Sequence, residues 1–296
     1  MPQCLICSSA NVGVYLQDAD NALDVTKMGS SRTQLSPGTI LRCRACGFAF
    51  REDRSNQQQL ADLYRSMDPA VYQAELRGRT RTASRHLRIV SEALQRKSAG
   101  ELLDVGCASG LFLSTALDAG WRVTGLEPSQ TLFAQAVERI GSRGTVLPVI
   151  LEEVDFGTDH FDVVTLWDVL EHVVDPMNFL KRCRGLLKPG GHLFLNVPDL
   201  DSLEARLLGR RWPLLLPEHL NYFHRPSLRL CAEKCGFQVI RFGRRRAHFS
   251  VGYVLYRLAQ HRIPLAKLVS GTARTSLGRA LVPVSLGETY AALRCS

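Results

Sequence analysis

The chain has 296 residues, 45% of them hydrophobic, and a formal net charge of +9, so it is long enough for one large domain and a smaller appendage. No apolar run reaches the ~18 residues that span a bilayer, and the N-terminus lacks the basic and apolar regions of a signal peptide, which predicts a cytoplasmic protein without a transmembrane segment. In that compartment the nine cysteines, an odd number, argue against a disulfide framework.

Four cysteines near the N-terminus form two matched pairs, Cys4-x-x-Cys7 and Cys43-x-x-Cys46. Each such turn directs two thiolates at one point, and two turns supply the tetrahedral four-sulfur shell that zinc prefers. A site with four protein ligands is expected to be structural, whereas a redox dithiol, the alternative, would need only one pair. We therefore predict a zinc-binding module over residues 1–55. Most of the other five cysteines are expected to be small buried hydrophobic residues: Cys107, Cys183, Cys231, Cys235 and Cys295.

Residues 56–97 have the pattern of a helical lid or linker between this module and the next domain. The segment contains Tyr64 and Tyr72, and its arginines recur at near-helical spacing. Such spacing favours a solvated helix face, with contact to an anionic group as the alternative. The arginines are Arg77, Arg79, Arg81, Arg85 and Arg88.

A buried parallel strand is predicted at the start of residues 101–110, where an apolar run ends in Asp104 and turns through Gly106 and Gly110. A second strand, residues 121–127, ends in Glu127. A carboxylate at that strand end can accept both hydroxyls of a ribose. The Asp-x-Gly-x-x-x-Gly spacing differs from the dinucleotide fingerprint, and an acid in this loop would repel a pyrophosphate.

Further strands and turns follow along the chain. Residues 161–166 form a strand, and Trp167 to His172 are predicted to begin the helix after it. A helix end and tight turn at residues 186–191 lead into a strand at residues 192–197. Later strands are predicted at residues 236–240 and 288–294, and the stretch at about 248–283 between them is predicted to be a helical insertion.

In their order and spacing these motifs resemble class I S-adenosylmethionine (SAM) methyltransferases, from about residue 86 to 242 and again at the C-terminus. The resemblance implies an α/β fold with a seven-stranded Rossmann-like sheet in a SAM-binding domain over residues 98–296. SAM carries a cationic sulfonium and ammonium and no phosphate, so an acidic loop suits it. The implied cofactor-binding residues are Asp104, Gly106, Cys107, Ser109, Gly110, Glu127, Trp167 and Asp168.

The acceptor side is expected after the fifth strand, in residues 217–224. This segment resembles the His-Glu-His-Phe-x-Tyr stretch of deoxysugar C-methyltransferases, which also carry an N-terminal four-cysteine zinc module. Pro217 replaces the first His and Leu220 the Phe, so the chain fits better a broader group with a Glu-His-Leu-x-x-Phe pattern, associated with glycan and secondary-metabolite pathways.

These resemblances place four candidate catalytic residues. His219 is the expected general base, because an imidazole titrates near neutral pH; packing against the following helix is the alternative. Glu218 would orient it or act as base, and Tyr222 matches the Tyr of the sugar enzymes. Tyr72 either lines the pocket or anchors the lid by packing. His172 is expected to be structural.

The predicted function is methyl transfer from SAM to a hydroxyl or acidic carbon of a small-molecule, sugar-like or natural-product acceptor. The alternative is an RNA methyltransferase with a zinc-ribbon recognition module, favoured by the net charge and the basic cluster at residues 241–246. The scattered basic residues and the lack of an amino-methylation motif weigh against RNA. A third alternative is a SAM-binding regulator without catalysis.

Overall fold

The computed structural model describes residues 2–18, 37–54, 75–94, 100–260 and 275–296. Tyr64 and Tyr72 lie outside these ranges, so the prediction that Tyr72 lines the pocket stays a prediction. None of the helices in the described ranges is long and apolar enough to cross a membrane.

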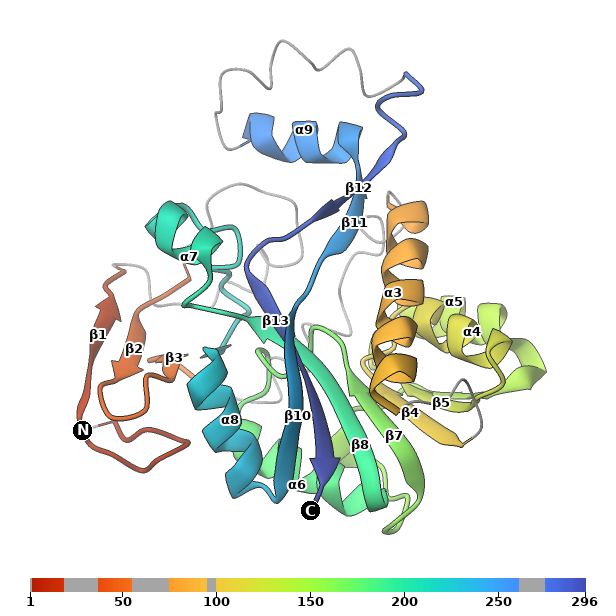
Figure 1. The fold of residues 1–296 in the computed structure, drawn as a ribbon, viewed down its shortest axis with the longest axis horizontal. Helices are drawn as coiled ribbons and strands as arrows, with labels where there is room; N and C mark the ends of the chain where they lie inside the picture. The colour runs from red at the N-terminus through yellow and green to blue at the C-terminus, as the bar shows by residue number, and fades with distance from the viewer. Residues whose placement is uncertain (1, 19–36, 55–74, 95–99, 261–274) are drawn as a thin grey trace.

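A seven-stranded sheet forms the centre of the protein (Figure 1), which confirms the α/β prediction. The strand order is β6-β5-β4-β7-β8-β13-β10. The pairs from β6 to β8 are parallel, whereas β13 is antiparallel to both β8 and β10. The strands are β4 (Glu101–Val105), β5 (Arg122–Leu126), β6 (Thr145–Leu147), β7 (Phe161–Leu166), β8 (Leu187–Pro198), β10 (Phe237–Arg244) and β13 (Glu288–Cys295).

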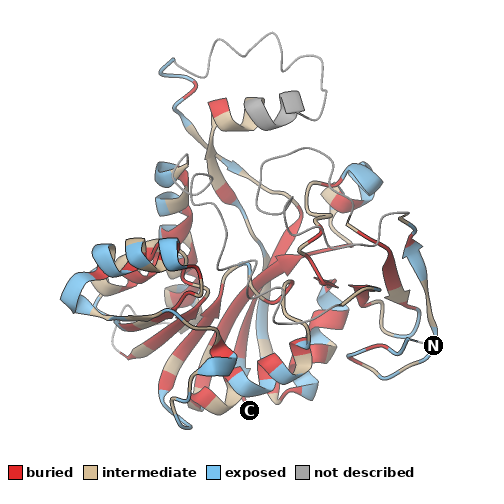
Figure 2. Ribbon diagram, turned by 180° about the vertical axis from the view of Figure 1, so that it is seen from behind, coloured by how far each residue is buried: buried red, intermediate tan, exposed pale blue. Residues whose placement is uncertain are grey.

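Helices cover both faces of this sheet, and each face has its own apolar core. Figure 2 shows the buried strands between helices whose outer faces are exposed. On one face lie α3 (Leu76–Leu94), α4 (Leu111–Asp118) and α5 (Gln130–Ile140); on the other lie α6 (Pro176–Leu186) and α8 (Arg225–Lys234). The short helices are η2 (Gly141–Arg143), η3 (Leu151–Glu153), α7 (Leu203–Leu208) and η4 (Gly209–Arg211).

The N-terminal module is joined to the large domain by backbone pairing. Its strands β1 (Val12–Leu16), β2 (Ile40–Cys43) and β3 (Ala49–Arg51) form an antiparallel sheet whose fourth strand is β9 (Asn221–Tyr222). Ala49 pairs with Tyr222 and Phe50 with Asn221. The module therefore shares a sheet with the segment that was predicted to form the acceptor side.

The insertion before the last strand is only partly helical. It contains α9 (Val251–Gln260), but its ends form an antiparallel ribbon of β11 (Ala247–Ser250) and β12 (Leu281–Val284). Because these two strands pair with each other, both ends of the insertion are extended where helix was predicted. Residues 261–274 lie outside the described ranges.

The helix after β7 also begins later than predicted. Residues 167–172 form a turn, and α6 starts at Pro176. The side chain of Asp175 accepts a hydrogen bond from the amide of Asn178 and caps the helix, while the proline occupies its first turn. The residues before this cap are therefore available to line a site.

Candidate active site

A cavity of about 410 Å³ lies at the carboxyl ends of β4, β5 and β7, where ligands bind in parallel α/β sheets. The loop after β4 forms one wall, and α3 and β11 form another. Seven of the predicted cofactor-binding residues line this cavity: Asp104, Gly106, Cys107, Ser109, Glu127, Trp167 and Asp168. Gly110 is not among the lining residues; with φ of 74° it is the residue from which α4 starts.

Glu127 is held rigidly at the end of β5. Its two carboxylate oxygens accept hydrogen bonds from the backbone amides of Ala108 (2.8 Å) and Ser129 (2.9 Å). Each oxygen keeps lone pairs for further donors, as a ribose would supply. Burial raises the pKa of Glu127 to about 7, although the two amides oppose this. A ligand that donates to the carboxylate therefore stabilises its charged form.

Asp104 lies in the same wall and is also buried. Its Oδ1 accepts a hydrogen bond of 2.6 Å from the hydroxyl of Thr165 on β7. Burial, together with the charge of Glu127, raises the pKa of Asp104 to about 7, while the Thr165 bond opposes the shift. Two acids in one buried wall favour a ligand with positive charge and hydroxyl donors, which matches SAM.

An ion-pair network holds the turn after β7. Asp168 has a positive φ of 58°, and its carboxylate accepts hydrogen bonds from Arg245 (2.7 Å) and Asn196 (2.6 Å). Arg245 also binds both carboxylate oxygens of Glu288 (2.6 and 2.7 Å). Although burial raises it, the pKa of Asp168 is lowered to about 2 by Arg245 and Asn196. The network fixes Trp167 against the cavity.

Sequence reasoning missed three members of this network. Arg245 had been grouped with a basic cluster, and no role was assigned to Asn196 or Glu288. The available signal was a polar residue near the end of β8, Asn196, and one at the start of β13, Glu288, which lie at the same edge of the sheet because the two strands are antiparallel.

The predicted base His219 lies behind another histidine. His219 is buried, is absent from the cavity lining, and its Nδ1 donates to the carbonyl oxygen of Leu214 (2.9 Å). Its ring centroid lies 4.8 Å from that of His172, which does line the cavity. Burial, together with the neighbouring His172, lowers the pKa of His219 to about 3. The imidazole that faces the cavity is therefore His172, which sequence reasoning took as structural.

Glu218 and Tyr222 are also absent from the residues that line the cavity. The hydroxyl of the buried Tyr222 donates to the carbonyl oxygen of Leu216 (3.1 Å). Glu218 contributes its backbone, because its carbonyl oxygen lies 3.0 Å from Nδ1 of His172. A carbonyl only accepts, so Nδ1 of His172 carries the proton and Nε2 of the neutral ring keeps its lone pair. Glu218 thus supports His172 through its backbone, whereas the ring of Tyr222 meets that of His219, with centroids 6.1 Å apart.

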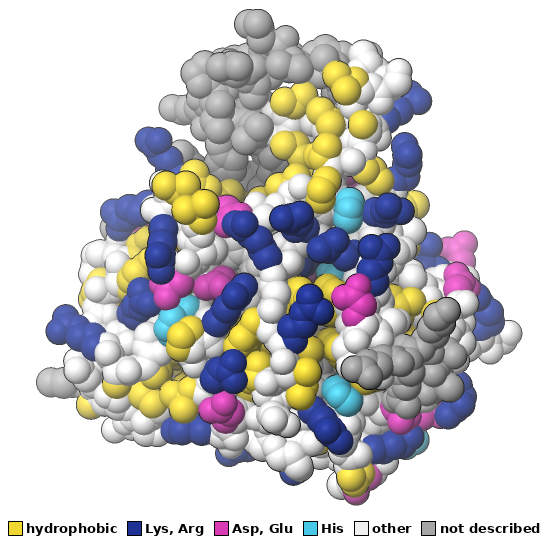
Figure 3. Space-filling model, viewed as in Figure 1, with side chains coloured by type: hydrophobic (Ala, Val, Ile, Leu, Met, Phe, Trp, Pro, Cys, Tyr) yellow, Lys and Arg dark blue, Asp and Glu magenta, His cyan; other side chains and the backbone are white. Residues whose placement is uncertain are grey.

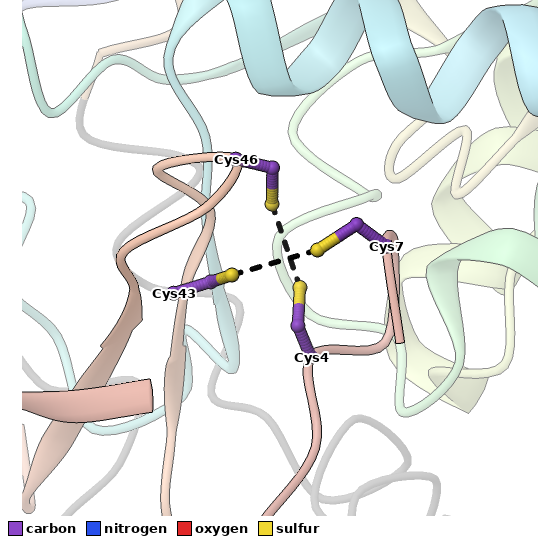
Figure 4. Close-up of side chains that lie close together, drawn as sticks. All are labelled: Cys4, Cys7, Cys43 and Cys46. Atoms are coloured by element: carbon purple, nitrogen blue, oxygen red, sulfur yellow. Dashed lines mark hydrogen bonds between the residues drawn. The ribbon is translucent and has the colours of Figure 1, made fainter. Parts of the chain in front are cut away.

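Within the described residues, two clusters of side chains have the donor atoms of a metal site. In Figure 4 the four N-terminal cysteines converge, with 3.5 Å between the sulfurs of Cys4 and Cys46 and between those of Cys7 and Cys43. A tetrahedron with Zn–S bonds of about 2.3 Å has sulfurs ~3.8 Å apart, so the cluster fits zinc. The second cluster is Glu171, His172 and His219, whose ligand atoms lie within 4.8 Å of one another; it could hold a divalent cation.

A family model described as a methyltransferase domain matches residues 72–241, more than half of the chain. The chain belongs to this family. It therefore contains a methyltransferase domain, and the cavity at the sheet edge is the candidate cofactor site.

Among curated proteins, the ubiquinone biosynthesis O-methyltransferase of Yersinia pestis is 38% identical over 110 residues, which cover 34% of this chain and 44% of the relative. The match thus spans less than half the length of that relative. Among solved structures, the 1,6-didemethyltoxoflavin-N1-methyltransferase of Burkholderia thailandensis has a TM-score of 0.54 at 18% identity, covering 84% of this chain and 96% of that one.

A second similar structure is that of the (4+2)-cyclase SpnF, with a TM-score of 0.51 and 20% identity over 72% of this chain and 80% of that one. At these identities the likeness shows the fold alone. The cyclase illustrates why the acceptor chemistry must be argued from the site.

Replacement of Glu127 by Ala should weaken SAM binding by about 1.5–3 kcal/mol, because it removes charge-assisted hydrogen bonds to the ribose. Isothermal titration calorimetry measures this, with Glu138→Ala as the control, since Glu138 is an exposed acid on α5. Equal affinity of the Glu127 variant and the native chain would contradict the assignment.

SAM binding should release protons between pH 6 and 7. In the free protein the pKa values of Glu127 and Asp104 are raised to about 7, and the ligand binds the charged carboxylates, so a bound proton must leave. Affinity should therefore fall as the pH is lowered from 8 to 6. Calorimetry in two buffers of different ionisation enthalpy counts the protons that are released on binding. Proton uptake on binding would contradict the assignment that the bound carboxylates are charged.

The native chain should contain one zinc ion, and Cys43→Ser should lose most of it because a closed four-sulfur shell needs all four thiolates. Elemental analysis of the purified proteins measures the stoichiometry, and Cys295→Ser, which lies outside the cluster, is the control. Full zinc content in Cys43→Ser would show that the ligand set is wrong.

Proposed function

We propose that the protein transfers the methyl group of SAM to a hydroxyl oxygen of a small-molecule acceptor. One observation carries this proposal: a neutral imidazole, His172, lines the cavity, and its tautomer is set by the Glu218 carbonyl. About a third of the chain (34%) is also similar to part of an O-methyltransferase.

The sulfonium of bound SAM supplies an activated methyl group, so the protein must mainly align the acceptor and remove one proton. Burial lowers the pKa of His172 to about 4, against the opposing effect of the Glu218 contact. The ring is therefore neutral at pH 7, and Nε2 can accept the proton of a hydroxyl whose oxygen is losing electron density to the methyl carbon. His219 packs against this ring and positions it.

Aromatic side chains shape the rest of the acceptor space. His86 stacks on Trp167, with ring centroids 3.9 Å apart and planes at 15°. Phe112 meets Trp167 edge-on, and Phe249 also lines the cavity. Flat apolar walls of this kind favour a planar hydroxylated acceptor such as a phenol or catechol.

We propose zinc as the structural ion of the N-terminal cysteine cluster. Its place is supported by the sulfur geometry, and its effect on the active site would be indirect. Because β3 pairs with β9, the module supports the segment that carries Glu218 and His219.

His172→Ala should lower kcat on catechol by about 10²- to 10⁴-fold, the usual contribution of a positioned base, while SAM affinity stays unchanged. Formation of S-adenosylhomocysteine measures turnover, and His160→Ala, an exposed histidine, is the control. His219→Ala should lose less than His172→Ala, because it acts through its neighbour.

The assay is repeated after EDTA treatment, since Glu171, His172 and His219 could hold a cation. Activity that survives EDTA but not His172→Ala supports the base role, and activity lost on EDTA and restored by Mg²⁺ contradicts it in favour of a metal ligand. If SAM binds but RNA alone is methylated, the small-molecule proposal is wrong.

A further inference from the structure

One surface helix, α7, turns its large apolar side chains toward solvent. The buried side chain of this helix is that of Ala205, whereas Leu203 and Leu207 are 61% and 75% exposed. Leu208, the last residue of the helix, is 45% exposed. Leu203 and Leu207 lie one helical turn apart and so share one face. A surface helix normally buries its large apolar side chains against the core, and α7 has the reverse pattern.

Contacts at both ends of α7 hold this orientation. The hydroxyl of Ser202 accepts a hydrogen bond from the amide of Ala205 (3.1 Å) and caps the first turn. After the helix, Trp212 is buried, and its indole nitrogen donates to the carbonyl oxygen of Leu286 (2.6 Å). The chain passes close to Ser202 at Gly287, where a Cβ would strike the serine hydroxyl. The exposed leucines therefore belong to a helix that is anchored on both sides.

Arginines lie beside these leucines. Three exposed arginines occur in α7 and in η4, which directly follows it: Arg206, Arg210 and Arg211. The acids of the same segment have partners, because Glu204 accepts two hydrogen bonds of 2.7 Å from Arg244. Asp201 lies 3.5 Å from Arg42 and 3.9 Å from Arg206. Figure 3 shows hydrophobic side chains over α7 with Lys and Arg side chains next to them, so this surface is both apolar and basic.

Charge and position indicate which partner this surface fits. Clustered large apolar side chains on the outside of a protein mark a contact site. A second copy of the chain would bring the same arginines together, and like charges across an interface repel. In Figure 1, α7 lies at an outer edge of the molecule, where its leucines can reach into a flat surface. An anionic bilayer matches both features, because leucines enter the boundary between headgroups and acyl chains while arginines stay at the lipid phosphates.

We propose that α7 and η4 form a docking surface for a bilayer that contains anionic lipid. The side chains of Leu203, Leu207 and Leu208 enter the bilayer, and the neighbouring arginines contact the lipid phosphates. This contact goes beyond the proposed function, since it depends on neither the cofactor nor the acceptor.

The test mixes the full chain with vesicles made of equal parts phosphatidylcholine and phosphatidylglycerol, and flotation measures the bound fraction. We expect binding that falls as salt is added and is weaker on pure phosphatidylcholine, because the arginines act on lipid charge. A variant that combines Leu203→Ser with Leu207→Ser should lose affinity by about tenfold or more, because two apolar side chains no longer leave water. Arg211→Gln should weaken binding to the anionic vesicles alone.

The matched controls are Val137→Ser and Arg88→Gln, since both residues are exposed on helices that lie away from α7 (Figure 1). Both variants should bind vesicles like the native chain. A second measurement uses Leu207→Trp, which keeps a large apolar side chain at the proposed contact. Brominated lipid should quench its fluorescence more than that of the native chain, so position 207 is tested even where the serine variant does not fold.

The proposal is overturned by an absence of binding to the anionic vesicles, or by equal affinity of the native chain and the folded serine variant. Quenching in Leu207→Trp that is no greater than in the native chain overturns it as well. Sedimentation velocity supplies a further arm. A dimer that the serine variant loses, in a chain that does not bind vesicles, overturns the proposal in favour of contact with a second copy.

Discussion

The arrangement of the active site depends on one ion-pair network, in which Arg245 joins the half-exposed Asp168 to the buried Glu288. Asn196 on β8 bonds both carboxylates, so four chain segments meet at one point. Arg245 and Glu288 form the buried part of this network, and removal of one of these two partners leaves the other charge uncompensated, at a cost of about 3–5 kcal/mol. The network fixes the turn after β7, and with it the positions of Trp167 and His172.

A second constraint ties the N-terminal cysteine module to the same turn. Arg54, just after β3, donates to the carbonyl oxygens of Val174 and Leu220 and to the side chain of Asn221. The buried Arg51 donates to the carbonyl oxygen of Pro217 (2.6 Å). The module thus satisfies backbone carbonyls in the turn that follows His172 and in the segment that contains His219.

The fold and the cofactor half of the site could be predicted from sequence because their signals are local. The Asp104 loop, Glu127 and the two cysteine pairs each fall within a few residues of a strand or turn. The acceptor half could not be predicted in the same way. Three of its features depend on contacts between segments far apart in sequence, which no local pattern records. They are which of His172 and His219 faces the cavity, the ion pairs of Arg245, and the ribbon of β11 and β12.

The central claim is that the cavity holds SAM with its methyl group directed toward His172. A crystal structure with bound S-adenosylhomocysteine tests this most directly. The account predicts ribose hydroxyls on the Glu127 carboxylate, the amino acid end along the Asp104 loop, and the sulfur facing the space between Trp167 and His172. A ribose away from Glu127, or a sulfur directed away from His172, would contradict it.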